Sequence, residues 1–412
     1  MTTGHLPLSA SKKRSILLLS FATFSSMASQ RICDAMLPEL SRVFSVSLSQ
    51  AALVVSAFAV VYGLAQLFYG PLGDRLGKFR IVTFATLGCS VGSIMAIFAT
   101  SLNMLVFARV LVALGAAAII PLTMAWIGDA VTHDRLQETL ARVGLGTTLG
   151  IVGGQLAGGL VTDMLGWRWA FGFMTVLFGV VGSLLYVDWC RQQVDARSAR
   201  AAPSITAAPA LVRPGFVTQA FSIITGSWSR VVLGVAVIEG AVGFGVLAIW
   251  ASHLHRAHGL SLSASGAIVA LFGMGGMLYM ALARHLIRRF GERGLASLGV
   301  CLLGLSALVV GFTPYWVLAV PASLLGGFGF FMFHNTMQTN ATQMTPGARG
   351  TAVSLFASSL FLGQSVGVAL AAGLADRIGS GLVIALGGGL LTTVGLFFAQ
   401  ALNRRDRLRQ QR

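Results

Sequence analysis

Long apolar segments separated by short polar ones follow one another along almost the whole chain. A helix needs roughly 20 residues to cross the hydrocarbon core of a bilayer, and most of these segments approach that length. The pattern therefore predicts an all-α membrane protein in which each segment is a transmembrane helix. We expect twelve such helices, at residues 15–38, 49–70, 80–100, 103–127, 138–162, 168–188, 230–252, 263–284, 294–312, 315–337, 350–373 and 380–402.

Composition supports a location in the membrane. Of the 412 residues, 55% are hydrophobic and only 10% are charged, which is too apolar for an ordinary soluble protein. The four cysteines are scattered and form neither a disulfide framework nor a Cys-x-x-Cys metal site. No phosphate-binding loop occurs, so direct drive by ATP is not expected. We expect no cofactor and no metal.

The net charge of +16 could indicate a nucleic-acid partner, so its distribution along the chain matters. With a cytoplasmic N-terminus and twelve crossings, most of the 29 Lys and Arg residues fall on the cytoplasmic side. The exceptions are Arg42, Arg168, Arg256 and Arg377 outside, and Arg31 and Arg109 within predicted helices. This excess of cytoplasmic bases is typical of multi-pass membrane proteins. We therefore expect both termini in the cytoplasm, and no nucleic acid as a partner.

A basic segment that bears Pro and Ala interrupts the apolar pattern near the middle of the chain and predicts a cytoplasmic linker. We divide the chain into a six-helix bundle at 1–190, the linker at 191–229 and a second six-helix bundle at 230–412. An internal repeat with an offset of 213 supports two related bundles: Gly150, Gly154, Asp163 and Gly166 match Gly363, Gly367, Asp376 and Gly379. Such repeats are typical of transporters that bind substrate between their halves.

Three motifs carry a resemblance to a known family. The stretch YGPLGDRLGKFR (69–80) matches the pattern G-x-L-x-D-R-x-G-K/R-x-R/K, and RVLVALGAAAIIP (109–121) places Arg109 within a helix. The stretch GIVGGQLAGG (150–159) matches G-x-x-x-G-P-x-x-G-G, with Gln155 where the proline belongs. In these motifs the chain resembles a twelve-helix transporter of the major facilitator superfamily, in its bacterial drug:proton antiporter and metabolite-exporter branch. The glycines of the third motif are Gly150, Gly154, Gly158 and Gly159.

The resemblance implies a function as well as a fold. It implies a secondary transporter of the bacterial inner (plasma) membrane, and not an enzyme, that exports a small amphipathic molecule or drug in exchange for protons. We expect a monomer that works by alternating access. An importer or facilitator of a small metabolite with the same fold is the alternative, which the missing proline leaves open. A non-transporting membrane receptor is a third.

By the same resemblance, the first motif forms a conformational latch. The N-terminus of a helix attracts anions, and the eleventh helix is expected to begin near Thr351. Asp74 would contact it and hold the halves in the outward-facing state, while a neighbouring base pairs with Asp129. Simple anchoring of the bases at the membrane surface is the alternative. The residues of the latch are Gly70, Asp74, Arg75, Gly77, Lys78, Arg80 and Asp129.

Two acids lie inside the predicted membrane segments, and not at their first or last residue, in a region where charge is costly and commonly functional. Asp34, near the outer end of the first helix, is expected at a similar depth to Arg109. We predict that Asp34 alternates between an ion pair with Arg109 and a protonated state. A fixed pair with Arg31, one turn away, is the alternative.

Glu239 is expected close to the midplane in the seventh helix. We predict that it lines the central cavity, where it binds a cationic or hydrogen-bonding substrate or carries the proton. The alternative is a neutral Glu239 that is hydrogen-bonded to a neighbouring helix.

Several other polar residues are candidates for contact with substrate. His334, Asn335 and Gln338 occur in the tenth helix, and depth counting places them near the cytoplasmic mouth as a gate or cap. Gln155 and Gln364 occur in the fifth and eleventh helices, as substrate ligands or as interhelical hydrogen-bond partners.

Overall fold

The computed structural model describes residues 9–199, 216–345 and 348–410, and within these ranges all regular secondary structure is helical. This confirms the all-α fold class. The first half contains α1 (Ala10–Arg31), α2 (Leu37–Val43), α3 (Leu48–Ala51), α4 (Leu53–Leu76), α5 (Lys78–Ile97), α6 (Leu102–Ala130), α7 (His133–Leu165) and α8 (Trp167–Ala199). The second half contains α9 (Phe216–Thr225), α10 (Ser227–Ile238), the π-helix η1 (Glu239–Gly245), α11 (Trp250–His258), α12 (Leu262–Phe312), the short 3-10 helix η2 (Trp316–Leu318), α13 (Ala319–Gln343), α14 (Arg349–Ile378) and α15 (Ser380–Gln410).

Among the described residues, 10 helices are long and apolar enough to cross a membrane. One of them is α12, whose 51 residues include Gly291 with non-helical dihedral angles (φ 62°, ψ 179°). Gly291 therefore joins two helices. The serine-rich helix α1, with three bases near its start, is not among the 10. Twelve crossings result when α1 is included and α12 is counted as two.

Some helix ends differ from those expected from the apolar segments. The first helix ends at Arg31, not near residue 38, and a turn leads into α2, where Pro38 occupies the first helical turn. In the expected linker, α8 continues to Ala199 and α9 forms a further helix. The remainder of that linker, residues 200–215, lies outside the described residues.

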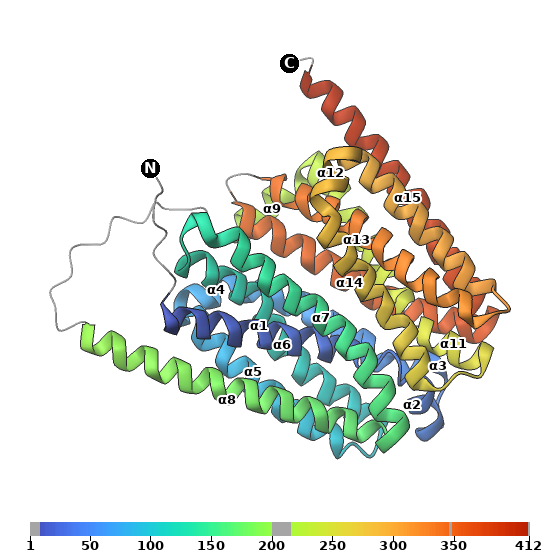
Figure 1. Ribbon diagram of the computed structural model, residues 1–412, viewed down its shortest axis with the longest axis horizontal. Coiled ribbons are helices and arrows are strands. Elements are labelled where there is room, and N and C mark those ends of the chain that lie inside the picture. Colours follow the sequence, from blue (N-terminus) through green and yellow to red (C-terminus); the bar gives the residue numbers. More distant parts are fainter. Residues whose placement is uncertain (1–8, 200–215, 346–347, 411–412) are drawn as a thin grey trace.

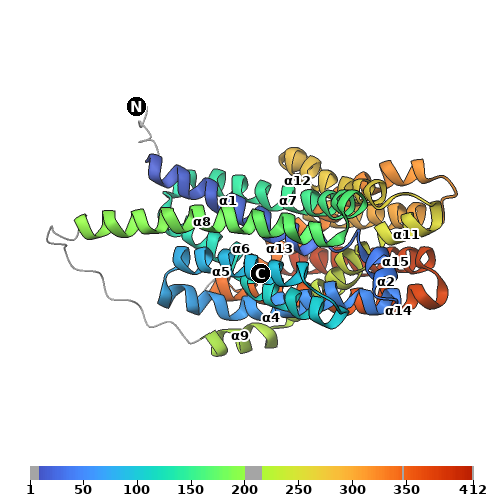
Figure 2. The same cartoon turned by 90° about the horizontal axis from the view of Figure 1, so that it is seen from below.

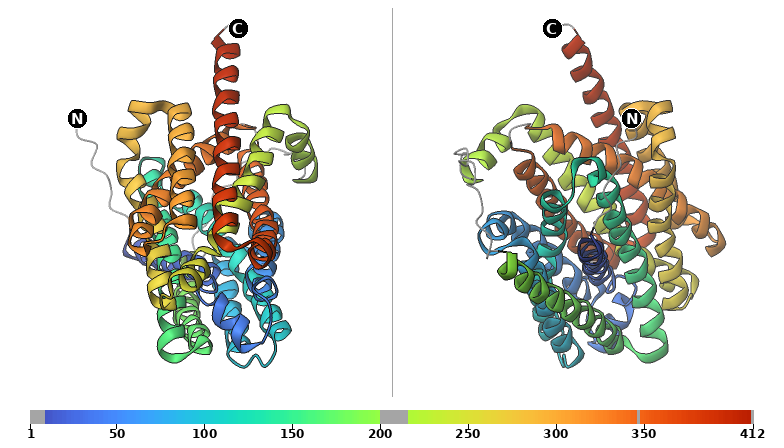
Figure 3. Two further views of the ribbon diagram at one scale, coloured as in Figure 1. Left: turned by 90° about the vertical axis from the view of Figure 1, so that its right-hand side faces the viewer. Right: turned by 60° about the vertical axis from the view of Figure 1, so that its left-hand side comes forward.

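The membrane helices run between two opposite faces (Figure 1). We call the face with the start of α1 and the end of α15 the proximal face, and the face with α2, α3 and the end of α11 the distal face. Figure 2 shows α9 at the edge of the bundle near α4, and in Figure 3 the end of α15 projects beyond its neighbours on the proximal side. In the orientation predicted from the sequence, the proximal face is cytoplasmic.

The two halves contact each other mainly through two related helix pairs, α4 with α14 and α7 with α12. Between α4 and α14, the hydroxyl of Ser358 donates to the carbonyl of Gly63 (2.7 Å) and that of Ser365 to the carbonyl of Ser56 (2.9 Å). Such hydrogen bonds join helices that lipid alone does not drive together. The exact residue boundaries of the two bundles stay predictions.

Glycines allow α7 to lie directly against α1. At Gly146, Gly150, Gly154 and Gly158, a Cβ atom would meet the carbonyl oxygens of Ser20, Phe24, Ala28 and Ile32, respectively. Both series advance by four residues, so one face of α7 follows one face of α1 along their length. In the second half, Gly363 and Gly367 of α14 contact the backbone at Val237 and Ala241 in the same manner. The repeat seen in the sequence is thus a repeat of backbone contacts.

This close approach predicts opposite effects for two alanine substitutions in α7. A Cβ at position 154 clashes with the backbone of Ala28, whereas one at position 144 meets open space. Gly154→Ala should therefore lower the free energy of unfolding by roughly 1–3 kcal/mol through overpacking. Gly144→Ala should leave it unchanged or raise it by up to about 1 kcal/mol, because alanine favours helix. Thermal unfolding of the detergent-purified variants measures both, and equal stability would contradict the packing.

Candidate functional site

A buried ion pair lies where α1 ends. Asp34 is in the turn after α1, and its backbone amide donates to the carbonyl of Arg31 (3.2 Å). The Arg31 guanidinium approaches the Asp34 carboxylate with 3.3 Å between Nη1 and Oδ2, and both side chains are almost fully buried. A buried pair of this kind is held in place by its other contacts, because each charge loses its hydration.

Gln155 supplies one of those contacts. Its side-chain amide donates to Oδ2 of Asp34 (2.9 Å) from α7. Gln155 follows Gly154, whose close contact with α1 brings this part of α7 to the end of that helix. The residue that replaces the expected proline therefore binds the carboxylate.

Arg109 has other partners. It donates from Nη1 to the hydroxyl of Ser29 (3.2 Å) and from Nε to the carbonyl of Val54 (3.3 Å). Its guanidinium lies over the ring of Phe58, 4.1 Å from the centroid. In this structure, Asp34 is thus paired with Arg31, the alternative partner, and not with Arg109.

Arg31 also reaches the second half. Its guanidinium lies 4.4 Å from the centroid of the Phe244 ring, in η1, and Nη1 is 3.5 Å from the carbonyl oxygen of Phe244. Next to it, the Gln30 side chain donates to Oε1 of Gln364 in α14 (3.2 Å). The end of α1 therefore contacts both η1 and α14 through polar groups.

Glu239 is the first residue of η1 and is fully buried. Its Oε1 is 2.7 Å from Nδ1 of His334 in α13, and its Oε2 has no hydrogen-bond partner among the described residues. Glycines within η1 allow this approach, since a Cβ at Gly240 would clash with the carbonyl of Leu360 and one at Gly243 with the ring of Phe330. A π-helix carries an extra residue per turn and is frequent at functional sites.

His334 does not lie at the proximal mouth, where depth counting placed it. It is level with Glu239 because α13 continues to Gln343, beyond the apolar segment. Polar partners hold that extension: Asn340 donates to Glu292 (3.1 Å) and accepts from Arg405 (2.8 Å). The imidazole of His334 stacks on the ring of Phe330, with 5.6 Å between the ring centroids, and its centroid lies 6.3 Å from that of the Phe244 ring.

The other two candidates in α13 differ in environment. Asn335 donates to the hydroxyl of Tyr279 in α12 (2.8 Å). Gln338 is exposed. Within the described residues, neither side chain forms a hydrogen bond with Glu239.

The sequence profile described as the Major Facilitator Superfamily matches residues 19–368. The chain belongs to this superfamily. Among its relatives, the putative uncharacterized transporter YgaY of Escherichia coli K12 is 26% identical over 390 residues, which are 92% of this chain and 93% of YgaY. The multidrug export protein EmrB of the same strain is 27% identical over 173 residues, 42% of this chain and 34% of EmrB.

A solved structure shares the fold over almost the whole chain. It is a bacterial homolog of the human lysosomal transporter Spinster, in an inward-facing and unoccupied conformation. It superposes with a TM-score of 0.70 at 19% identity and covers 96% of each chain. The superfamily fold predicted from the sequence is therefore confirmed.

The loop motif of the superfamily is present, but among the described residues Asp74 has no hydrogen bond or ion pair with the start of α14. Asp74 is 71% exposed and lies 3.3 Å from Nζ of Lys78, which is 2.5 Å from Asp129. Arg75 is exposed, and the Arg80 guanidinium lies 5.9 Å from the Trp189 ring. At the start of α14, Thr351 donates instead to Gln219 of α9 (2.7 Å).

The glycines of the loop motif and of the α7 motif have distinct environments. Gly77 has φ +92°, a conformation that favours glycine, and ends α4. Gly70 has open space around its Cα. Gly159 of the α7 motif lies against the backbone of Leu262 in the second half.

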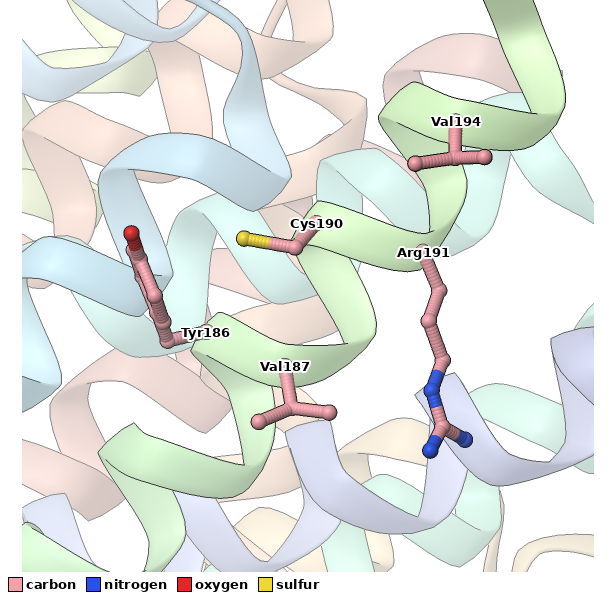
Figure 4. Close-up of a pocket in the computed structure, with 5 residues that line it drawn as sticks. All are labelled: Tyr186, Val187, Cys190, Arg191 and Val194. Carbon is pink, nitrogen blue, oxygen red and sulfur yellow. The ribbon is translucent and has the colours of Figure 1, made fainter.

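A groove of about 430 Å³ lies between α1 and α7 on the proximal side. Exposed Leu17, Phe21 and Leu149 contribute apolar surface, and Lys13 and Arg142 contribute positive charge. The groove extends to Phe24, about two turns before Arg31. A second hollow involves α8 alone (Figure 4), on side chains far in sequence from any candidate residue.

Sequence reasoning missed Phe244 as a partner of Arg31 and Tyr279 as a partner of Asn335. The run EGAVGFG (239–245) gave a signal for Phe244, because its glycines indicate close contact between backbones. No sequence pattern indicated Tyr279. The described residues contain no group of three or more His, Cys, Asp or Glu side chains arranged to hold a metal ion.

The ion pair can be tested by removing its members singly and together. Arg31→Met leaves the buried Asp34 carboxylate without its counter-charge and should cost about 3–5 kcal/mol. Combined with Asp34→Leu, it should regain most of that stability, because neither charge of the pair remains. Thermal unfolding of the purified variants measures the coupling between the two substitutions.

Arg109 provides the matched control. The pair Arg109→Met and Asp34→Leu should show nearly additive losses, because these side chains share no hydrogen bond. If this pair restores stability and the Arg31 pair does not, the assignment of Arg31 as the partner of Asp34 is wrong.

Proposed function

We propose that this protein is a proton-coupled secondary transporter of the bacterial inner membrane that exports a small amphipathic molecule by alternating access. The observation that carries the proposal is a continuous set of contacts from Asp34 through Arg31 to Phe244, His334 and Glu239. It joins Asp34 and Glu239, the two acids that we expect inside the membrane segments, and it crosses from the first half to the second.

Protonation of Asp34 would act on the contact between the halves. A neutral Asp34 no longer attracts the Arg31 guanidinium. The ion pair helps to orient that guanidinium toward Phe244 of η1, so its loss weakens the contact with η1. Weakening this contact changes the relative stability of the states in which the two halves are together or apart at the end of α1. A proton on Asp34 would thereby shift the balance between these states.

Glu239 is the proposed second proton site. A proton on its carboxylate would alter the contact with His334, while its free oxygen Oε2 can accept a hydrogen bond from substrate. Because Glu239 starts the π-helix that carries Phe244, a change at Glu239 alters the segment that Arg31 contacts. The two acids are therefore coupled through one structural element.

Three further observations support export of an amphipathic molecule. The α1–α7 groove combines apolar and basic side chains, and it approaches Arg31 from the proximal side. Among the described residues, Asp74 pairs with Lys78 and has no contact with α14, which agrees with a latch that forms only in the outward-facing state. EmrB, a relative over part of the chain, is a multidrug export protein.

Gln155 favours a second candidate, an importer or facilitator of a small metabolite. The proline that it replaces belongs to the motif of antiporters, and here the side chain binds Asp34 instead. The direction of proton flux separates the two candidates.

The role of Glu239 gives a direct test. Compounds that raise the unfolding temperature of the purified protein in a library screen are first identified and then added to liposomes that contain it. Each such compound should move protons opposite to its own flux in the wild type. Glu239→Gln should lower proton-driven accumulation of the compound at least tenfold. It should preserve exchange of labelled for unlabelled compound, because the variant still binds the compound but no longer couples its movement to protons.

Glu39→Gln, at an acid of α2 that pairs with Arg42, serves as the control and should retain the proton flux. Unchanged proton-driven transport by Glu239→Gln would rule out its role as a coupling residue. Proton movement in the same direction as the compound would instead support the importer.

A further inference from the structure

Asp163 binds the start of a helix in the opposite half. It lies two residues before the end of α7, at the distal face. Its Oδ2 accepts from the backbone amide of Ser263 (2.5 Å) and from the Ser263 hydroxyl (2.6 Å), and its Oδ1 accepts from the amide of Leu262 (3.3 Å). Leu262 and Ser263 are the first two residues of α12.

Asp376 makes the reverse contact. It lies two residues before the end of α14, and its Oδ2 accepts from the backbone amide of Ser49 (2.9 Å). Ser49 is the second residue of α3, which continues with α4 as one membrane span from Leu48 to Leu76. Each half thus offers one aspartate to the other and receives one in return.

The sequence repeats both sides of this exchange. Asp163 and Asp376 match at the offset of 213, and the tripeptide Ser-Leu-Ser at 47–49 recurs at 261–263 with an offset of 214. The reciprocal contacts therefore arise from the same repeated elements.

At each of the two helix starts, a serine of the same half and an aspartate of the opposite half accept hydrogen bonds from different backbone amides. The first amides of a helix have no partner within it. The hydroxyl of Ser47 accepts from the third amide of α3, and that of Ser261 accepts from the third amide of α12. Of the earlier amides, Asp163 binds both at α12, and Asp376 binds that of Ser49 at α3. The charge of each aspartate also suits the positive end of the helix.

We propose that Asp163 and Asp376 form a reciprocal clasp that stabilises the state closed at the distal face. The clasp, defined by these aspartates and the two Ser-Leu-Ser segments, must break when the halves separate there. Its role rests on the proposed function only in so far as alternating access requires such separation. It would complement the proposed latch at Asp74, which lies at the opposite face.

Distances between spin labels on the two halves test the clasp without any substrate. Phe98 and Tyr315 are 68% and 69% exposed and lie at the distal end of the first and second half, respectively. Both are replaced by labelled cysteines in a chain whose four native cysteines are changed to alanine. In lipid nanodiscs, Asp163→Ala and Asp376→Ala should each raise the ratio of long to short distances about fivefold, as expected for the loss of one helix cap.

Glu39→Ala is the matched control, because Glu39 is an acid on the distal side that pairs only within α2, with Arg42. It should leave the distances unchanged. The proposal is overturned if neither aspartate variant changes the distance ratio, or if Glu39→Ala changes it as much. If the aspartate variants shift the distances while no compound is transported, the clasp holds and the proposed transport function fails.

A second substitution isolates the hydrogen bond itself. Ser49→Pro removes the donor amide without a change of charge, and proline is tolerated in the first turn of a helix. It should shift the distances as Asp376→Ala does, and the double variant should shift them no further. Fully additive shifts would show that Asp376 acts through a contact other than the Ser49 amide.

Discussion

Direct backbone contact between α1 and α7 determines the geometry of the whole candidate site. Glycines at every fourth position of α7 bring its backbone against the carbonyls of α1, which side chains at those positions would prevent. That contact continues to the end of α1, and there it places Gln155 beside Asp34. In lipid, where no hydrophobic effect drives helices together, such close packing is a main source of helix association. The ion pair is therefore positioned by the packing of residues that carry no charge.

The two halves repeat each other in backbone but not in charge. Related glycines connect α7 with α1 and α14 with α10 and η1. The buried guanidinium groups, however, belong to the first half, at Arg31 and Arg109, while the second half contributes Glu239 and His334. Pseudo-symmetry thus gives the two halves a common backbone frame, and its loss at these side chains gives them different chemistry.

The fold and the approximate membrane segments were predictable because spanning helices must be apolar and near 20 residues long. The depth of each site residue in the membrane and the identity of its partners were less predictable. Counting from apolar limits misplaced His334, since α13 continues through polar residues that Glu292 and Arg405 stabilise from distant parts of the chain. Asp34 was expected within a helix, but it lies in the turn after it, which brings Arg31 closer than Arg109. Such pairings depend on helix rotation, which one sequence does not encode locally.

The two sides of the clasp at the distal face differ in their number of hydrogen bonds. Asp163 accepts three hydrogen bonds from the start of α12, whereas Asp376 accepts one from Ser49. Gly159 adds backbone contact on the Asp163 side, while Gly373 meets only the Ser49 hydroxyl on the other. Separation of the halves would then begin between α3 and α14, with the α7–α12 seam as the hinge. An opening at this face would therefore widen from one edge of the molecule.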